Sequence, residues 1–83
     1  MEKEKFVALL SLITAALIEK IIQTYHLSED DAIDNLYGTE FYKYLENEKT
    51  KFWHYSIEKM FDIYQTEIET GRIEVPEYWF KHN

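Results

Sequence analysis

The hydrophobic pattern of this chain is strongest in one stretch near its start, FVALLSLITAALIEKIIQTY, residues 6–25. Its large apolar residues recur at helical spacing, so the stretch predicts a single helix. They fall on two stripes: Phe6, Leu9, Leu10, Ile13, Leu17 and Ile21 form the heavier one, and Val7, Ile18, Ile22 and Tyr25 form the other. A helix that is apolar on nearly all sides is normally buried. We therefore expect this helix to lie inside the core.

Two shorter helices are predicted in the middle of the chain. Ser28 precedes a run of acidic residues, a pattern typical of a helix N-cap, and the helix that follows is expected to end in a left-handed cap at Gly38. Thr39 then caps a third helix over residues 40–47. The residues of that helix expected to face inward are Phe41, Tyr44 and Leu45.

The second half of the chain predicts a polar loop, a long helix and a tail. Residues 46–51, ENEKTK, break the periodicity and predict a surface loop. Ser56 is expected to cap a helix over residues 57–70 that stops at Gly71. The apolar stripe of this helix is Ile57, Met60, Phe61, Tyr64 and Ile68. Residues 72–83 predict an extended aromatic tail, because Pro76 disfavours helix there.

Length and composition favour one small domain over residues 1–83, an all-α irregular helical bundle with a long buried N-terminal helix and a second long helix near its end. A chain of 83 residues buries only about 60–65% of its unfolded surface. The sequence has no cysteine, which removes disulfides and thiolate metal sites. The protein is predicted to be cytoplasmic, and the absence of cysteine is compatible with that location.

Charge and helix length argue against two classes of partner. The formal net charge is −7 and the basic residues are scattered, so nucleic acid and anionic membrane surfaces are not expected to bind. A membrane span needs about 20 uninterrupted apolar residues, whereas the uncharged run of the first helix ends before Glu19 and Lys20. A buried helix of a soluble protein is the favoured interpretation.

Few residue patterns suggest chemistry. Asp30, Asp31 and Asp34 have the D-D-x-x-D spacing with which isoprenoid synthases hold magnesium, but those enzymes enclose a deep cavity that this chain is too short to form. Helix capping is the simpler role for these acids. His54 and Glu58 are one turn apart, which gives two metal ligands where three are needed. We therefore expect no catalytic, cofactor-binding or metal-binding residues.

Three segments between Leu27 and Glu77 are LSEDDAIDNLYGTEFYKYL, ENEKTKFWHYS and EIETGRIEVPE. Together they resemble a group of small bacterial helical proteins of unassigned function. The resemblance implies a compact bacterial all-helical protein and carries over no catalytic residue. Some similar short acidic proteins accompany toxins. This leaves open an antitoxin-like or inhibitory role, in which the acidic surface would block a basic active site or DNA-binding face.

The other predicted helices can cover only one broad side of the first helix, which leaves its second stripe facing water. This uncovered stripe predicts a homodimer. The expected interface residues are Val7, Ser11, Ala15, Ile18, Ile22 and Tyr25, with the small ones allowing two helices to approach closely. The aromatic residues of the tail, Tyr78, Trp79 and Phe80, are expected to dock on their own core, on a second subunit or on a foreign partner. The favoured function is a non-enzymatic, homo-oligomeric protein-interaction module. The alternatives are the inhibitory role and a divalent-metal enzyme that uses Asp30, Asp31 and Asp34.

Overall fold

The structure, a computed structural model that describes residues 1–74, is all-α. Its α-helices are α1 (Lys3–Tyr25), α2 (Glu29–Tyr37), α3 (Glu40–Leu45) and α4 (Ile57–Thr70). Two single 3-10 turns, η1 (Glu48–Thr50) and η2 (Phe52–His54), connect α3 to α4. The described part is 78% helical and contains no strand, which confirms the predicted fold class.

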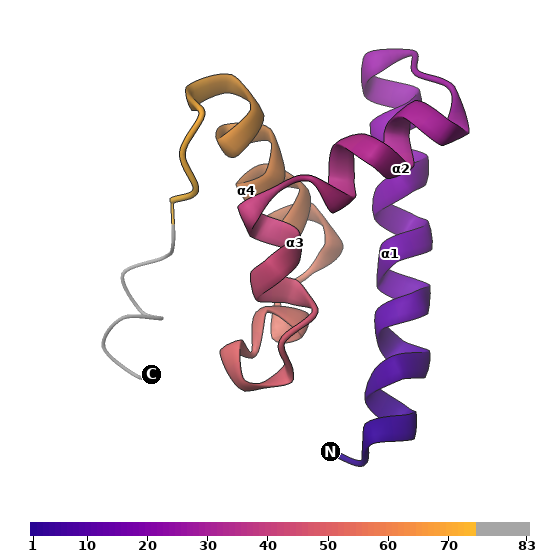
Figure 1. The fold of residues 1–83 in the computed structure, drawn as a ribbon, viewed down its shortest axis with the longest axis vertical. Coiled ribbons are helices and arrows are strands. Elements are labelled where there is room, and N and C mark those ends of the chain that lie inside the picture. The colour runs from indigo at the N-terminus through magenta and orange to yellow at the C-terminus, as the bar shows by residue number, and fades with distance from the viewer. Residues whose placement is uncertain (75–83) are drawn as a thin grey trace.

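The long helix α1 forms one side of the molecule (Figure 1). α2 crosses from the upper end of α1 towards α3 and α4, which stand together on the other side. Both α2 and α4 pack on α1, and α3 packs on α4. The longest dimension of the molecule is 35 Å, close to the length of about 34 Å expected for a helix of 23 residues. One helix therefore runs the full length of the molecule.

The core lies between α1 and the shorter elements. Its largest fully buried side chains are Leu17, Ile21, Leu36, Phe41, Leu45, Phe52, Met60 and Tyr64. They come from all four α-helices and from η2, which together form a single core. The heavier stripe of α1 faces this core as predicted, with Phe6, Ile13, Leu17 and Ile21 buried.

The predicted helix starts are confirmed. Ser28 Oγ accepts a hydrogen bond from Asp31 N at 3.1 Å, and Ser56 Oγ accepts one from Lys59 N at 3.1 Å. Thr39 Oγ1 accepts from the third amide of α3 at 3.1 Å. Each hydroxyl satisfies an N–H that has no partner within its own helix.

The prediction of a left-handed cap at Gly38 is wrong. Gly38 has φ −82°, and the left-handed residues that follow α-helices in the described part are His26 (φ 57°) and Gly71 (φ 77°). A Cβ on Gly38 would lie 3.3 Å from Asp34 O, so glycine at this position gives space for a close turn rather than a positive φ. The turn leads directly into Thr39, which allows α2 and α3 to follow each other without a linker.

Three other differences from the predictions concern helix bounds and burial. α1 begins at Lys3, before its apolar run, and α3 ends at Leu45, because the chain then enters the η1 turn. In α4, Ile63 is buried while Ile68 is 41% exposed, because α4 also packs on α3. These shifts leave the order of elements unchanged.

α1 buries its heavier stripe and leaves another part of its surface open, including Val7 of the second stripe. Leu12 is 71% exposed and Val7 is 52% exposed. The physical reason is length: α2 and α4 are both shorter than α1 and pack against only part of its surface. An apolar face of α1 is therefore left open to solvent.

A carboxylate from α4 caps α3. Glu67 Oε2 accepts from Glu40 N at 2.8 Å, and Glu67 Oε1 accepts from Phe41 N at 2.8 Å. Together with Thr39, this satisfies the first three amides of a helix that is only six residues long. A negative charge at a helix N-terminus also interacts favourably with the helix dipole. Glu67 thus connects two elements that are distant in sequence.

Replacing Glu67 with Gln should lower the free energy of unfolding by about 1–3 kcal/mol, because an amide keeps only one acceptor oxygen and loses the charge. Urea denaturation measures the change. The matched control is Glu69→Gln on the exposed side of α4, which should change the stability by less than about 0.5 kcal/mol. If the two substitutions lowered the free energy of unfolding equally, the hydrogen bonds from Glu67 to α3 would contribute nothing beyond the negative charge.

Alkaline pH should destabilise the fold through Tyr64. Burial, followed by the nearby Tyr25 and Glu67, raises the pKa of Tyr64 from 10.0 to about 12. Between these values the unfolded chain loses the phenolic proton while the folded chain keeps it, so stability falls as pH rises from about 10 to 12. The loss should be about 2–3 kcal/mol. Stability of Tyr64→Phe, measured by denaturation across this range, should fall less steeply.

Candidate functional site

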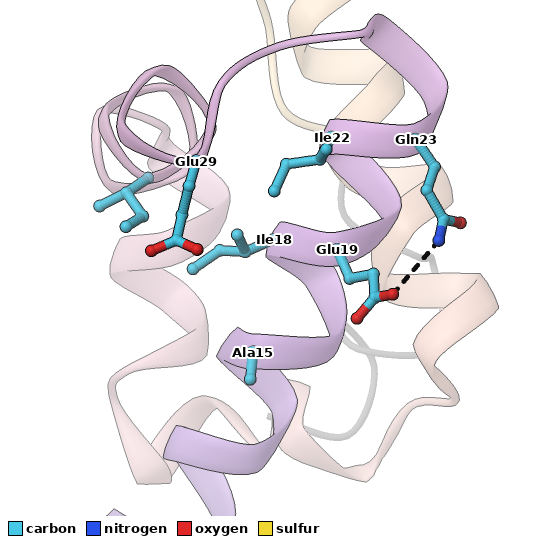
Figure 2. Close-up of a pocket in the computed structure, with 7 residues that line it drawn as sticks. Ala15, Ile18, Glu19, Ile22, Gln23 and Glu29 are labelled. Atoms are coloured by element: carbon cyan, nitrogen blue, oxygen red, sulfur yellow. Dashed lines mark hydrogen bonds between the residues drawn. The ribbon is translucent and has the colours of Figure 1, made fainter.

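A groove runs along the uncovered face of α1, where α2 and α3 approach it. One part is a hollow of about 390 Å³, which we call the glutamate hollow (Figure 2). Its lining residues are Ala15, Ile18, Glu19, Ile22, Gln23, Glu29 and Ile33. The second part, the tyrosine hollow, has a volume of about 290 Å³ and is lined by Val7, Leu10, Ser11, Thr14, Ala15, Ile18, Tyr37 and Tyr42. Ala15 and Ile18 belong to both, so the hollows form one continuous groove, the α1 groove.

The spacing of small and branched residues on α1 produces this groove. Val7, Ser11 and Ala15 follow one another at intervals of four residues and therefore share a helix face. The hydroxyl of Ser11 donates to Val7 O at 3.0 Å, so it is satisfied within the helix. Beyond Ala15, the larger Ile18 and Ile22 continue the same face. The floor therefore has small side chains at Ser11 and Ala15 and larger apolar ones at Ile18 and Ile22.

Two stacked tyrosines form the wall of the tyrosine hollow. The rings of Tyr37 and Tyr42 lie 4.6 Å apart between centroids, with an angle of 25° between their planes. Tyr42 is half-buried, and its hydroxyl lies 3.5 Å from Thr14 Oγ1 on α1. Burial, more than the neighbouring groups, raises the pKa of Tyr42. Tyr37 is 52% exposed. The pair therefore presents a rigid aromatic surface beside an apolar floor.

The glutamate hollow carries two acidic side chains. Glu19 accepts a hydrogen bond from Gln23 at 3.3 Å, and Figure 2 shows these two residues on one side of Ile18 and Ile22, with Glu29 on the other. The neighbouring cation Lys20 lies over the ring of Phe61 on α4, 5.6 Å from its centroid. Within residues 1–74, the salt bridges involve other carboxylates: those of Glu48, Glu40 and Asp62. Both glutamates of the hollow thus lack a basic partner in that part of the chain.

The structure brings together five of the six residues predicted for an interface. Val7, Ser11, Ala15, Ile18 and Ile22 all line the α1 groove.

Tyr25 lies elsewhere. Its ring packs edge-on against Tyr64 at 6.5 Å, and its hydroxyl accepts from Gln65 at 3.3 Å. It lines a separate hollow of about 270 Å³ with Leu27 and Ile68. The left-handed turn that follows at His26 ends α1, and Tyr25 packs back against α4. The predicted tail contacts Tyr78, Trp79 and Phe80 lie outside the described residues.

Sequence reasoning missed the residues that α2 and α3 add to the groove. Ile33 and Tyr37 lie on the apolar face of the second helix and Tyr42 lies outside the inward set of the third, and their pattern alone gives no sign that they border an open groove. The exposed Leu12 was also outside both predicted stripes. Helical spacing places Leu12 away from the heavier stripe, and this was the one sign in the sequence that Leu12 would be exposed.

The carboxylates weighed as metal ligands occupy the positions expected of capping acids. Asp30, Asp31 and Asp34 are exposed at and after the start of α2. His54 and Glu58 are exposed as well, and the His54 ring lies against Trp53 with 4.1 Å between centroids. Among residues 1–74, no three His, Asp or Glu side chains are placed to hold a metal ion.

α1 is long and apolar enough to cross a membrane by length and composition alone. The mean hydropathy of its most apolar window is 1.8, and 28% of that window is buried in the globule. α2 and α4 pack on α1 in the globule.

Comparisons with protein-family models, with curated proteins and with solved structures find no match. The resemblance over Leu27 to Glu77 stays a prediction.

The acids at the start of α2 should contribute to helix stability rather than bind metal. Ser28→Ala should lower the free energy of unfolding by about 0.5–2 kcal/mol through loss of the cap to Asp31 N. Magnesium should leave the melting temperature unchanged. If micromolar magnesium or calcium raised the melting temperature, and Asp31→Asn removed that rise, the acids would form a metal site instead.

Proposed function

We propose that this protein is a non-enzymatic, cytoplasmic protein-interaction module that forms a homodimer through the tyrosine hollow of the α1 groove. The observation that carries the proposal is the apolar floor of this hollow on α1, where Val7 is 52% exposed. Burying a large apolar side chain stabilises by about 1.5–3 kcal/mol. A domain of this size has only a few kcal/mol of net stability, so covering this face is a large gain.

The chemistry of the first half of α1 favours a second copy of this chain. The charged residues at its start, Glu2, Lys3, Glu4 and Lys5, sum to zero, so two copies approach without strong repulsion at this end. Ser11 and Ala15 leave space for two backbones to pack closely. The exposed face of Tyr37 can then contact the partner helix, as aromatic residues often do in interfaces.

The size of this face limits the dimer to a modest contact. Residues 3–18 of α1 span about 24 Å, and a helix with its side chains is about 10–12 Å wide, so the contact needs the tyrosine wall as well as α1. A specific interface buries at least about 1,000 Å² in total, which is about 500 Å² from each subunit. A twofold axis through Ser11 would use the same face of both subunits.

The aromatic tail is the competing occupant within one chain. The described chain ends at Glu74, and Figure 1 shows that this end lies on the far side of α3 and α4 from α1. Phe80 follows six residues later, a reach of about 20 Å at full extension. The tail of the same chain would have to pass around two helices within that length. A second copy meets no such restriction.

The dimer is tested by placing a large charge on the groove floor. Ser11→Arg should abolish association, because Ser11 is exposed and its replacement removes no core contact. The matched control is Thr24→Arg, which makes the same charge change at an exposed position on another side of α1. Sedimentation equilibrium at micromolar concentration should show dimers for the parent and the control, and monomers for Ser11→Arg. A parent protein that stays monomeric would contradict the proposal.

A further inference from the structure

We propose that the glutamate hollow binds an amphipathic helix of a different protein, one whose apolar stripe is bordered on both sides by Lys or Arg. This site lies beside the proposed dimer contact and does not depend on it. The first argument is its shape: the hollow has a volume of about 390 Å³, within the range of pockets that hold a ligand. Its floor, Ile18, Ile22 and Ile33, comes from two helices.

The position of the floor favours a helix as the occupant. Ile18 and Ile22 are one turn apart on α1, and Ile33 on α2 faces them across the hollow. A groove between two helices accepts apolar residues spaced at i, i+3, i+4 and i+7 on a third helix.

The charges around the floor determine the polar chemistry of the partner. Glu19 and Glu29 lie on opposite sides of Ile18 and Ile22 (Figure 2). Glu29 is exposed and its carboxylate has no hydrogen bond in the described part, while the carboxylate of Glu19 is hydrogen-bonded there only to Gln23, at 3.3 Å. Lys20, the nearest cation in sequence, is held over Phe61. A helix with basic residues on both borders of its apolar stripe would place one cation near each carboxylate.

The same charges disfavour a second copy at this end of the groove. Any twofold pairing that placed Ile18 and Ile22 against their equivalents would bring Glu19 and Glu29 of both copies together. Like charges at an interface oppose association, and the net charge of −7 on each copy adds to this. The two halves of the α1 groove therefore differ in charge: the first is neutral, and the second is acidic.

The experiment uses two synthetic amphipathic peptides about 18 residues long. Peptides of this length form a helix readily when they bind to the protein. Both carry the same leucine stripe; one has lysine and the other glutamate along its borders. Fluorescence anisotropy of the labelled peptides measures their dissociation constants from the full chain. The lysine peptide should bind at least about tenfold more tightly than the glutamate peptide, and the difference should shrink at high salt.

Two double variants locate the site. Glu19→Gln with Glu29→Gln should weaken binding of the lysine peptide by about fivefold or more. The matched control, Glu58→Gln with Glu69→Gln, removes the same charge from exposed positions on α4 and should change binding less than about twofold. Amide resonances of residues 15–23 and 29–33 should shift on titration with the lysine peptide, while those of α4 should not.

The outcomes separate this site from the dimer. The Ser11→Arg monomer should still bind the lysine peptide, so a failure of the dimer leaves this test intact. The proposal is overturned if both peptides bind equally, if the α4 control weakens binding as much as the groove variant, or if resonance shifts map elsewhere. It is also overturned if removing Glu19 and Glu29 strengthens self-association while no peptide binds, because a second copy would then be the occupant.

Discussion

The rest of the structure depends on a mismatch between α1 and the elements that pack on it. α1 has 23 residues and is apolar on more sides than α2 and α4 can cover. The core forms where Leu17 and Ile21 meet those helices, and it accounts for the heavier stripe of α1. The remaining surface of α1 keeps in solvent Val7, which lines the groove, and Leu12, which lies outside it. Since burial of apolar surface is the main favourable term in folding and association, this open face is the part of the molecule from which function is inferred.

The polar contacts of the chain are concentrated on the covered side. Glu67 joins α4 to the start of α3, and Tyr64 lies fully buried between Tyr25 and the core. On the open side the hydrogen bonds of Ser11 and Gln23 are local to α1, and one longer contact, 3.5 Å between Thr14 and Tyr42, connects α1 to α3. The covered side is therefore held by contacts between elements, while the groove has polar groups that need no rearrangement to accept another chain.

Much of the fold was predictable because its signals are local. The caps at Ser28 and Ser56 and the apolar periodicity define helices without reference to the rest of the chain. The groove was predictable only in part, because its floor belongs to one helix and its walls to others. Spacing alone identified Ser11 and Ala15. The stacking of Tyr37 beside the groove depends on where α2 crosses α1, which is a tertiary property. The Glu67 cap was missed for the same reason: its partner amides lie 26 and 27 residues away.

The central claim, that a second subunit covers the first half of α1, is tested most directly by a distance measured between two copies. The chain contains no cysteine, so a single Ala8→Cys substitution allows one spin label to be attached at an exposed position next to the groove. Helices packed across a twofold axis lie about 8–10 Å apart, so pulsed dipolar spectroscopy should give a label-to-label distance below about 30 Å. The absence of any dipolar coupling at micromolar concentration, or a short distance only for a label at Glu69 on α4, would contradict the account.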